Sequence, residues 1–239
     1  MRAILLIGAN FVRSQWIVLT IMLTYVTGIA IVFGIHSQPS EVLFFLQLHT
    51  YYAIILSALI AVPAIQNERK SRRILAVLSK GIYRWQYLAG LLSGCAMISA
   101  LFCLAVGAAT LFLARQVAMP MEGLPSFMAA LFFGCMATAS VALFCSILLH
   151  PLIALGGASI VLLLPLAIEA HGWHVTRALF PVASIARAVL EWSLGSDFRH
   201  PIHTHGLGRM AVASLIQAVL FLICSAVAFT RRDITTALE

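Results

Sequence analysis

The densest group of charged side chains lies between Gln66 and Tyr87, where six cations surround the acid Glu68 in a largely apolar chain. The cations are Arg69, Lys70, Arg72, Arg73, Lys80 and Arg84. A Lys or Arg at the centre of a membrane-spanning helix costs roughly 2.5 to 3.5 kcal/mol, and short basic loops stay on the cytoplasmic side. We therefore expect this basic segment to face the cytosol, where a water-soluble partner can contact it.

Histidines form the second chemically active group, in the region between the last two apolar stretches. They are His171, His174, His200, His203 and His205. Imidazoles at such spacings can ligate zinc or copper, so the last three are candidate metal ligands. No cysteine supports such a site, and a water-facing surface is the commoner setting for scattered loop histidines. The isolated His36, His49 and His150 are interpreted as packing or interface residues.

Patterns typical of enzymes are incomplete. The sequence from Gly156 to Ser159 resembles the nucleophile motif of rhomboid proteases, but Ile160 replaces the following glycine and no later span contains a histidine. A His-Glu-x-x-His zinc motif is absent, and Lys70-Ser71 lacks the preceding glycines of a phosphate-binding loop. We expect no catalytic residues. If the chain drives uphill transport, another chain hydrolyses the fuel.

Composition predicts a membrane protein. The chain is 62% hydrophobic and 10% charged, with a mean hydropathy of +1.02. Six stretches approach the 20 or so apolar residues that a spanning helix needs, and none has Asp, Glu, Lys or Arg in its interior. They are Trp16 to Ile35, Val42 to Ile65, Leu88 to Ala114, Phe127 to Leu149, Leu152 to Ile168 and Met210 to Phe229. We expect an all-α polytopic protein with six transmembrane helices.

The distribution of cations predicts the orientation. With the N-terminus inside, most Lys and Arg residues fall on the inner side, including Arg2, Arg13, Arg231 and Arg232 beside the basic segment. Six spans then return the C-terminus to the cytosol. The net charge of +7 reflects contact with anionic inner-leaflet lipid and requires no nucleic-acid partner. Ion-coupled transport is not favoured, because the spans offer His49 and an edge residue, Glu169, as ionisable groups.

Four regions flank the spans in this topology. Residues 1–15 are expected to form a membrane-surface helix, 66–87 a cytosolic loop, 170–209 an extracytoplasmic loop and 230–239 a cytosolic tail. In the outer loop, Ile185, Val189 and Trp192 share one helical face, and Pro181 suits a helix start. This short helix could gate the exit of a lipid-like substrate or passively cover the ends of the spans.

Small residues predict close helix contacts. Gly90 and Gly94 form a Gly-x-x-x-Gly pair, and Gly156 and Gly157 are adjacent. Without a side chain, glycine lets two helices approach closely. All five cysteines lie inside the predicted spans, where they are expected to pack rather than to form disulfides.

The basic segment resembles the signature loop of ABC-2-type transporter permeases. The positions in register are Glu68, Arg69, Leu78, Ser79, Arg84, Tyr87 and Gly90. The segment departs from the family pattern where Arg72-Arg73 replaces Gly-Thr, Gly81 replaces a proline and Leu91 replaces a lysine. Residues 179–190 resemble the helix before the family's last span, and 229–234 resemble its basic exit.

This resemblance implies half of an ABC exporter in a bacterial inner membrane. Two permeases, identical or paralogous, would join two cytosolic ATPase subunits that hold ATP and magnesium, and this chain itself would bind no cofactor. Residues Arg69 to Ser79 would form a coupling helix between spans two and three. The residues expected to act in coupling are Glu68, Arg69, Lys70, Arg72, Arg73, Ser79 and Arg84.

The absence of charge inside the spans favours an amphipathic or hydrophobic substrate. Two other functions stay open: a copper- or zinc-handling ABC permease, and a membrane assembly or anchoring protein whose basic segment recruits a cytosolic partner without transport. The cations of that segment could also simply bind anionic lipid.

Overall fold

The computed structural model describes residues 2–35, 38–70, 83–118, 123–150, 152–159 and 204–231, and the regular structure in these residues is entirely helical. The helices are α1 (Arg2–Ser14), α2 (Trp16–Ile35), α3 (Pro39–Lys70), α5 (Arg84–Gln116), α6 (Leu124–Leu148), a helix over 152–159 and α10 (Thr204–Arg231). The prediction of an all-helical polytopic protein is confirmed.

Five of these helices are long and apolar enough to cross a membrane. Their spanning portions are Trp16–Ile35, Pro39–Ile65, Arg84–Gln116, Leu124–Leu148 and Gly208–Arg231. The sixth predicted span, Leu152 to Ile168, is helical over 152–159 and otherwise lies outside the described residues. The chain is therefore a multi-pass membrane protein.

Several helices begin or end beyond the predicted spans, because polar residues at the membrane edge continue a helix. The first turn of α3 includes Glu41, whose Oε2 accepts a hydrogen bond from the Gln38 backbone nitrogen at 3.1 Å. At the start of α5, Gln86 Oε1 accepts one from the Tyr83 nitrogen at 3.3 Å. Such bonds satisfy backbone donors that the first helical turn leaves free.

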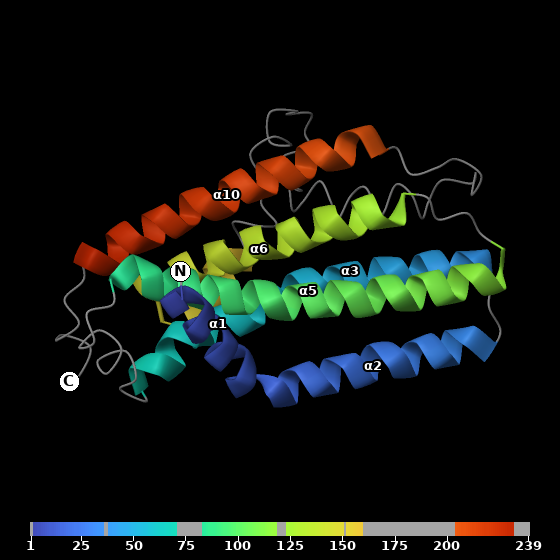
Figure 1. Cartoon of the computed structure of the whole chain (residues 1–239), viewed down its shortest axis with the longest axis horizontal. Coiled ribbons are helices and arrows are strands. Elements are labelled where there is room, and N and C mark those ends of the chain that lie inside the picture. The colour runs from blue at the N-terminus through green and yellow to red at the C-terminus, as the bar shows by residue number, and fades with distance from the viewer. Residues whose placement is uncertain are drawn as a thin grey trace.

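The long helices run side by side, with α2 and α5 in one direction and α3, α6 and α10 in the other (Figure 1). One end of the bundle holds α1, the last turns of α3, α6 and α10 and the first turn of α5. We call it the basic end, because Arg13, Arg84 and Arg231 lie there. At the opposite end lie Glu41, Arg115 and Arg209.

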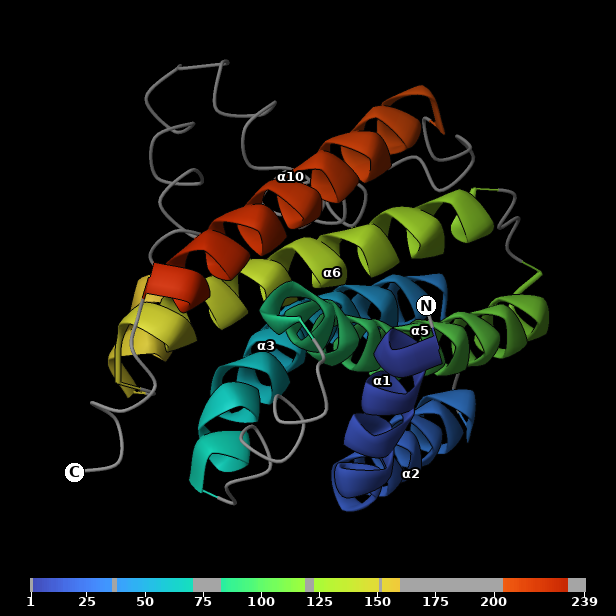
Figure 2. The same cartoon turned by 60° about the vertical axis from the view of Figure 1, so that its left-hand side comes forward.

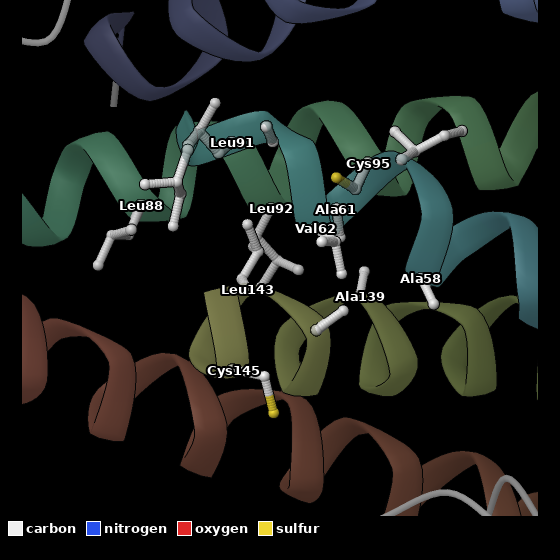
Figure 3. Close-up of a cluster of buried hydrophobic side chains, with 14 of the residues drawn as sticks. Ala58, Ala61, Val62, Leu88, Leu91, Leu92, Cys95, Ala139, Leu143 and Cys145 are labelled. Carbon is white, nitrogen blue, oxygen red and sulfur yellow. The ribbon is translucent and has the colours of Figure 1, made fainter. Parts of the chain in front are cut away.

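Helix α5 occupies the centre of the bundle, in contact with α1, α2, α3, α6 and α10. Beside the basic end, its Leu88, Leu91 and Leu92 pack against small side chains of α3 and α6, among them Ala61 and Ala139 (Figure 3). A second cluster, around Phe45, Phe102 and Phe127, fills the other half.

Buried hydroxyl groups tie the central helices together. Ser146 Oγ of α6 donates to the Val62 carbonyl oxygen of α3 at 2.6 Å, and the Ser57 and Ser99 hydroxyls of α3 and α5 lie 3.3 Å apart. Interhelical hydrogen bonds of this kind contribute about 1 kcal/mol in membranes, where water cannot compete.

Helices α2 and α10 lie at opposite edges of the bundle (Figures 1 and 2). Both expose large apolar side chains, such as Ile21 and Ile31 on α2 and Leu220 and Ile223 on α10. In a membrane these faces can contact lipid tails without a free-energy penalty, because the tails are as apolar as the side chains. Of the 20 residues of α2, two are buried, Val26 and Ala30, so α2 is weakly held by its neighbours.

The five cysteines are all free, and four of them are buried. The exception is Cys224, which is exposed on α10. The expectation that the cysteines pack in the interior therefore holds for four of the five and not for Cys224.

Candidate functional site

The described part of the chain contains some of the predicted coupling residues. Residues 68–70 are helical and belong to α3, which runs without a break from Pro39, and α5 begins at Arg84. The expected coupling helix therefore does not begin as a separate element at Arg69. The other predicted coupling residues, Arg72, Arg73 and Ser79, lie outside the described residues.

The predicted outer-loop sites also lie outside the described residues. These are the gate candidates Pro181, Ile185, Val189 and Trp192 and the metal candidates His200, His203 and His205. Among the side chains that the structure describes, no three of His, Cys, Asp or Glu come together as metal ligands.

Arg84 joins the start of α5 to the end of α10. Its Nη1 donates to the Phe229 carbonyl oxygen at 3.0 Å and to the Thr230 carbonyl oxygen at 3.1 Å, and its guanidinium carbon lies 5.8 Å from the centroid of the Phe229 ring. The last carbonyls of a helix lack partners within it and carry partial negative charge, so a cation is favoured there. The ring adds a cation–π attraction. Arg84 thereby connects the basic segment to α10.

Helix α1 lies across the first half of α5, and glycines set the distance between them. A Cβ atom on Gly90 would lie 2.7 Å from Ile7 Cβ, and one on Gly94 would lie 2.7 Å from Phe11 Cδ1. A Cβ atom on Gly8 of α1 would lie even closer to the Ser93 hydroxyl oxygen. The prediction that Gly90 and Gly94 allow close packing is confirmed, and the partner is α1.

The second pair of glycines gives a different result. Within the described residues, a Cβ atom on Gly156 would meet nothing within 4 Å, and one on Gly157 would make ordinary contact with Leu149 Cδ1 at 3.5 Å. Close packing at this pair was expected from the small side chains alone, but the described structure shows none. Adjacent small residues leave room for a partner helix without supplying one.

Helix α3 contains a proline near the basic end of the bundle. Pro63 lies inside α3, where it removes one backbone donor and favours a bend. The carboxyl-terminal turns of α3 slant away from α5 (Figures 1 and 2). The basic segment therefore leaves the bundle from a helix end that stands apart from the start of α5.

The environment of His49 was not foreseen from the sequence. It is fully buried on α3, and its Nδ1 lies 2.8 Å from the Phe45 carbonyl oxygen. Its Nε2 is also buried and has no hydrogen-bond partner among the described residues. Four aromatic rings surround the imidazole, from Tyr25, Phe45, Tyr52 and Phe102. Its interpretation as a packing residue accounts for the burial but not for the unpartnered nitrogen.

An apolar groove of about 570 Å³ lies between α5 and α6, in the half of the bundle away from the basic end. Leu104, Leu111, Pro125, Met128 and Phe132 are among its lining residues. Its surface is almost entirely apolar, so a hydrocarbon group matches it chemically.

No protein-family model matches the chain, and no curated protein matches it in sequence.

Proposed function

We propose that the chain is the permease subunit of an ATP-driven ABC exporter in a bacterial inner membrane. In this proposal two copies, or one copy and a paralogue, form the translocation pathway for an amphipathic or hydrophobic substrate. Separate cytosolic ATPase subunits bind ATP and magnesium. The observation that carries the proposal is the attachment of the basic segment, whose start continues α3 and whose end is tied to α10 through Arg84.

The directions of the helices support six crossings. Helices α6 and α10 both run toward the basic end, and Leu148 of α6 lines a groove there with Val227 and Arg231 of α10. The connection from α6 to α10 must therefore return to the opposite end of the bundle. With the five candidate spans we therefore expect six crossings, with α1, both ends of the basic segment and the end of α10 on one side. Their positive charge favours the cytosol.

The length of α3 suits a coupling element. Its apolar portion ends at Ile65, and residues 66–70 continue the same helix. At 1.5 Å per residue they extend it by roughly 7 Å. A helix that contacts a partner in water and continues into the membrane can transmit a displacement, whereas a loose loop cannot.

Arg84 gives such a displacement a second route. A pull on the basic segment reaches α5 directly, because Arg84 is the first residue of that helix. It also reaches α10 through the two carbonyl contacts of the guanidinium group. One cytosolic contact could thus move a central helix and a peripheral helix together.

Copurification tests this proposal. The tagged chain, extracted from its native membrane, should carry equal amounts of a subunit with nucleotide-binding motifs. In the double variant Arg69→Glu, Lys70→Glu, that subunit should no longer copurify with the chain. In the matched control Arg209→Glu, at the opposite end of the bundle, it should still copurify. A preparation without any nucleotide-binding subunit, or equal loss in both variants, would contradict the proposal.

A further inference from the structure

The environment of His49 is unusual for a polar side chain in a membrane protein. His49 is seven residues beyond Val42, where the apolar run of α3 begins, so it lies roughly 10 Å into a hydrocarbon core of about 30 Å. The ring centroid of Phe45 lies 4.0 Å from that of the imidazole, and Tyr25, Tyr52 and Phe102 lie at 5.8, 6.3 and 6.4 Å. Ionisable groups at such depth commonly mark substrate or ion pathways.

The hydrogen bond at Nδ1 fixes the chemistry of the other ring nitrogen. The Phe45 carbonyl oxygen can only accept, so Nδ1 must donate to it. In the neutral ring the proton is then on Nδ1, and Nε2 presents a lone pair. A group that satisfies Nε2 must therefore supply a hydrogen-bond donor.

The unpartnered nitrogen is costly where it lies. A buried polar atom without a partner loses its interaction with water and gains nothing in return. The neighbouring rings do not compensate for this loss, because Phe45 and Phe102 have no polar side-chain atoms, and neither tyrosine hydroxyl forms a hydrogen bond with Nε2. Nε2 is thus a buried acceptor held ready for a donor that the described chain does not supply.

Two half-exposed tyrosines lie between His49 and the edge of the bundle. Tyr25 on α2 and Tyr52 on α3 stack edge to face with their ring centroids 5.7 Å apart, and they are 40% and 42% exposed. In a membrane that exposure is toward lipid. Helix α2 is also the least buried of the candidate spans. A small outward movement of α2 would open a path from lipid to His49 between the two tyrosines.

We propose that His49 is the hydrogen-bonding residue of a binding site for an apolar molecule that carries a hydroxyl or amine donor, which enters from lipid between α2 and α3. The aromatic rings contact the apolar body, and Nε2 accepts the donor. As the substrate site of an exporter it rests on the proposed function. The binding itself does not, and it is tested without any ATPase.

Three naphthalene probes that differ in one substituent test the site. They are β-naphthol, its methyl ether, which lacks a donor, and β-naphthylmethylamine, which carries an ammonium group. The purified chain, labelled with nitrogen-15 histidine, is placed in lipid nanodiscs, and the signal that the variant His49→Phe removes is assigned to His49. β-Naphthol or the amine should move the Nε2 signal saturably toward its hydrogen-bonded position, and the methyl ether should not. Whichever donor gives the larger shift identifies the class of ligand.

Binding affinity gives a second measurement. His49→Phe keeps an aromatic ring but removes the acceptor, so the affinity for the effective donor probe should fall about tenfold, the usual effect of losing one buried hydrogen bond. The matched control His150→Phe changes an exposed histidine and should leave the affinity unchanged.

Several results would overturn the inference. An Nε2 signal that is already in its hydrogen-bonded position before any probe is added would mean that water or the chain itself fills the site. Equal shifts from β-naphthol and its methyl ether would show that the donor is irrelevant. No shift from any probe would show that the site does not open. The wild-type spectra decide these outcomes even if His49→Phe fails to fold.

Discussion

The contact between Arg84 and the end of α10 makes a measurable prediction about how the two helices are held together. Arg84→Met keeps the aliphatic stem but removes both hydrogen bonds to α10. The bond to the Phe229 carbonyl is partly buried and, with a charged donor, contributes about 1.5 kcal/mol. The bond to the Thr230 carbonyl is exposed and contributes about 0.5 kcal/mol.

The two hydrogen bonds alone contribute about 2 kcal/mol, which corresponds to about a 30-fold change in the equilibrium between docked and undocked ends of α10; loss of the cation–π contact with Phe229 acts in the same direction. Spin labels on cysteines at the exposed positions Trp85 and Val227 would report this distance. The variant Cys224→Ser is a sufficient background, because the other four cysteines are buried.

Wild-type protein should give one narrow distance distribution, and Arg84→Met should give a broad one with a longer component. Arg84→Lys should fall between them, since an ammonium group keeps the charge but lacks the planar fork of donors. The control Arg115→Met, in the last turn of the same helix, should leave the distribution narrow. A narrow distribution for Arg84→Met would refute the role assigned to the contact.

Three further predictions concern packing, topology and metal binding. Gly94→Leu should displace α1 from α5 and lower the free energy of unfolding by about 1 to 3 kcal/mol, which a lower unfolding temperature would report. The control Gly28→Ala, with nothing near its Cβ position, should have little effect. Equal unfolding temperatures for the two variants would be inconsistent with the α1 contact. Single cysteines introduced at Gln66 and at Ser196 should differ in their labelling by an impermeant maleimide on spheroplasts: the cysteine at position 196 should react, and the one at position 66 should be protected. Equal labelling of the two would exclude the six-span orientation. A triple variant in which Ala replaces all three candidate metal-binding histidines of the outer loop should contain as much bound metal as the wild-type protein. Loss of stoichiometric copper or zinc from this variant would favour a metal-handling permease.

The spans were predictable where apolar composition and polar boundaries coincide. The first span matches α2 at both ends, because Gln15 and His36 bound an uninterrupted apolar run. The second span was predicted to begin at Val42, but α3 begins at Pro39, since a proline and an acid are favourable in a first helical turn. Hydropathy measures the apolar run, whereas capping sets the helix ends.

Contacts between distant segments were much less predictable. Arg84 is 145 residues from Phe229, and its charge alone indicated a cytosolic contact rather than a helix end. The spacing of Gly90 and Gly94 indicated a close approach but did not identify α1 as the partner. These contacts depend on which helices are neighbours in the bundle, and apolar composition does not determine that arrangement.

His49 shows a further limit of the sequence. Phe45 four residues before it and Tyr52 three residues after it share its helical face, so an aromatic environment was foreseeable on α3 itself. The rings of Tyr25 and Phe102 come from other helices, and the unpartnered Nε2 follows from their packing. A single histidine in an apolar run therefore gave no sign of a binding site.

The central proposal, that the basic segment couples ATP hydrolysis to transport, is tested most directly at Glu68. It is the single acid among six cations, and a surface ion pair with Arg72, four residues on, would contribute about 0.3 to 0.5 kcal/mol, too little to decide folding. Glu68→Gln should therefore insert and assemble with its ATPase normally. In proteoliposomes at matched protein levels, it should lose most substrate-stimulated ATP hydrolysis and transport. Wild-type rates for this variant would contradict the assignment of the basic segment as the coupling element.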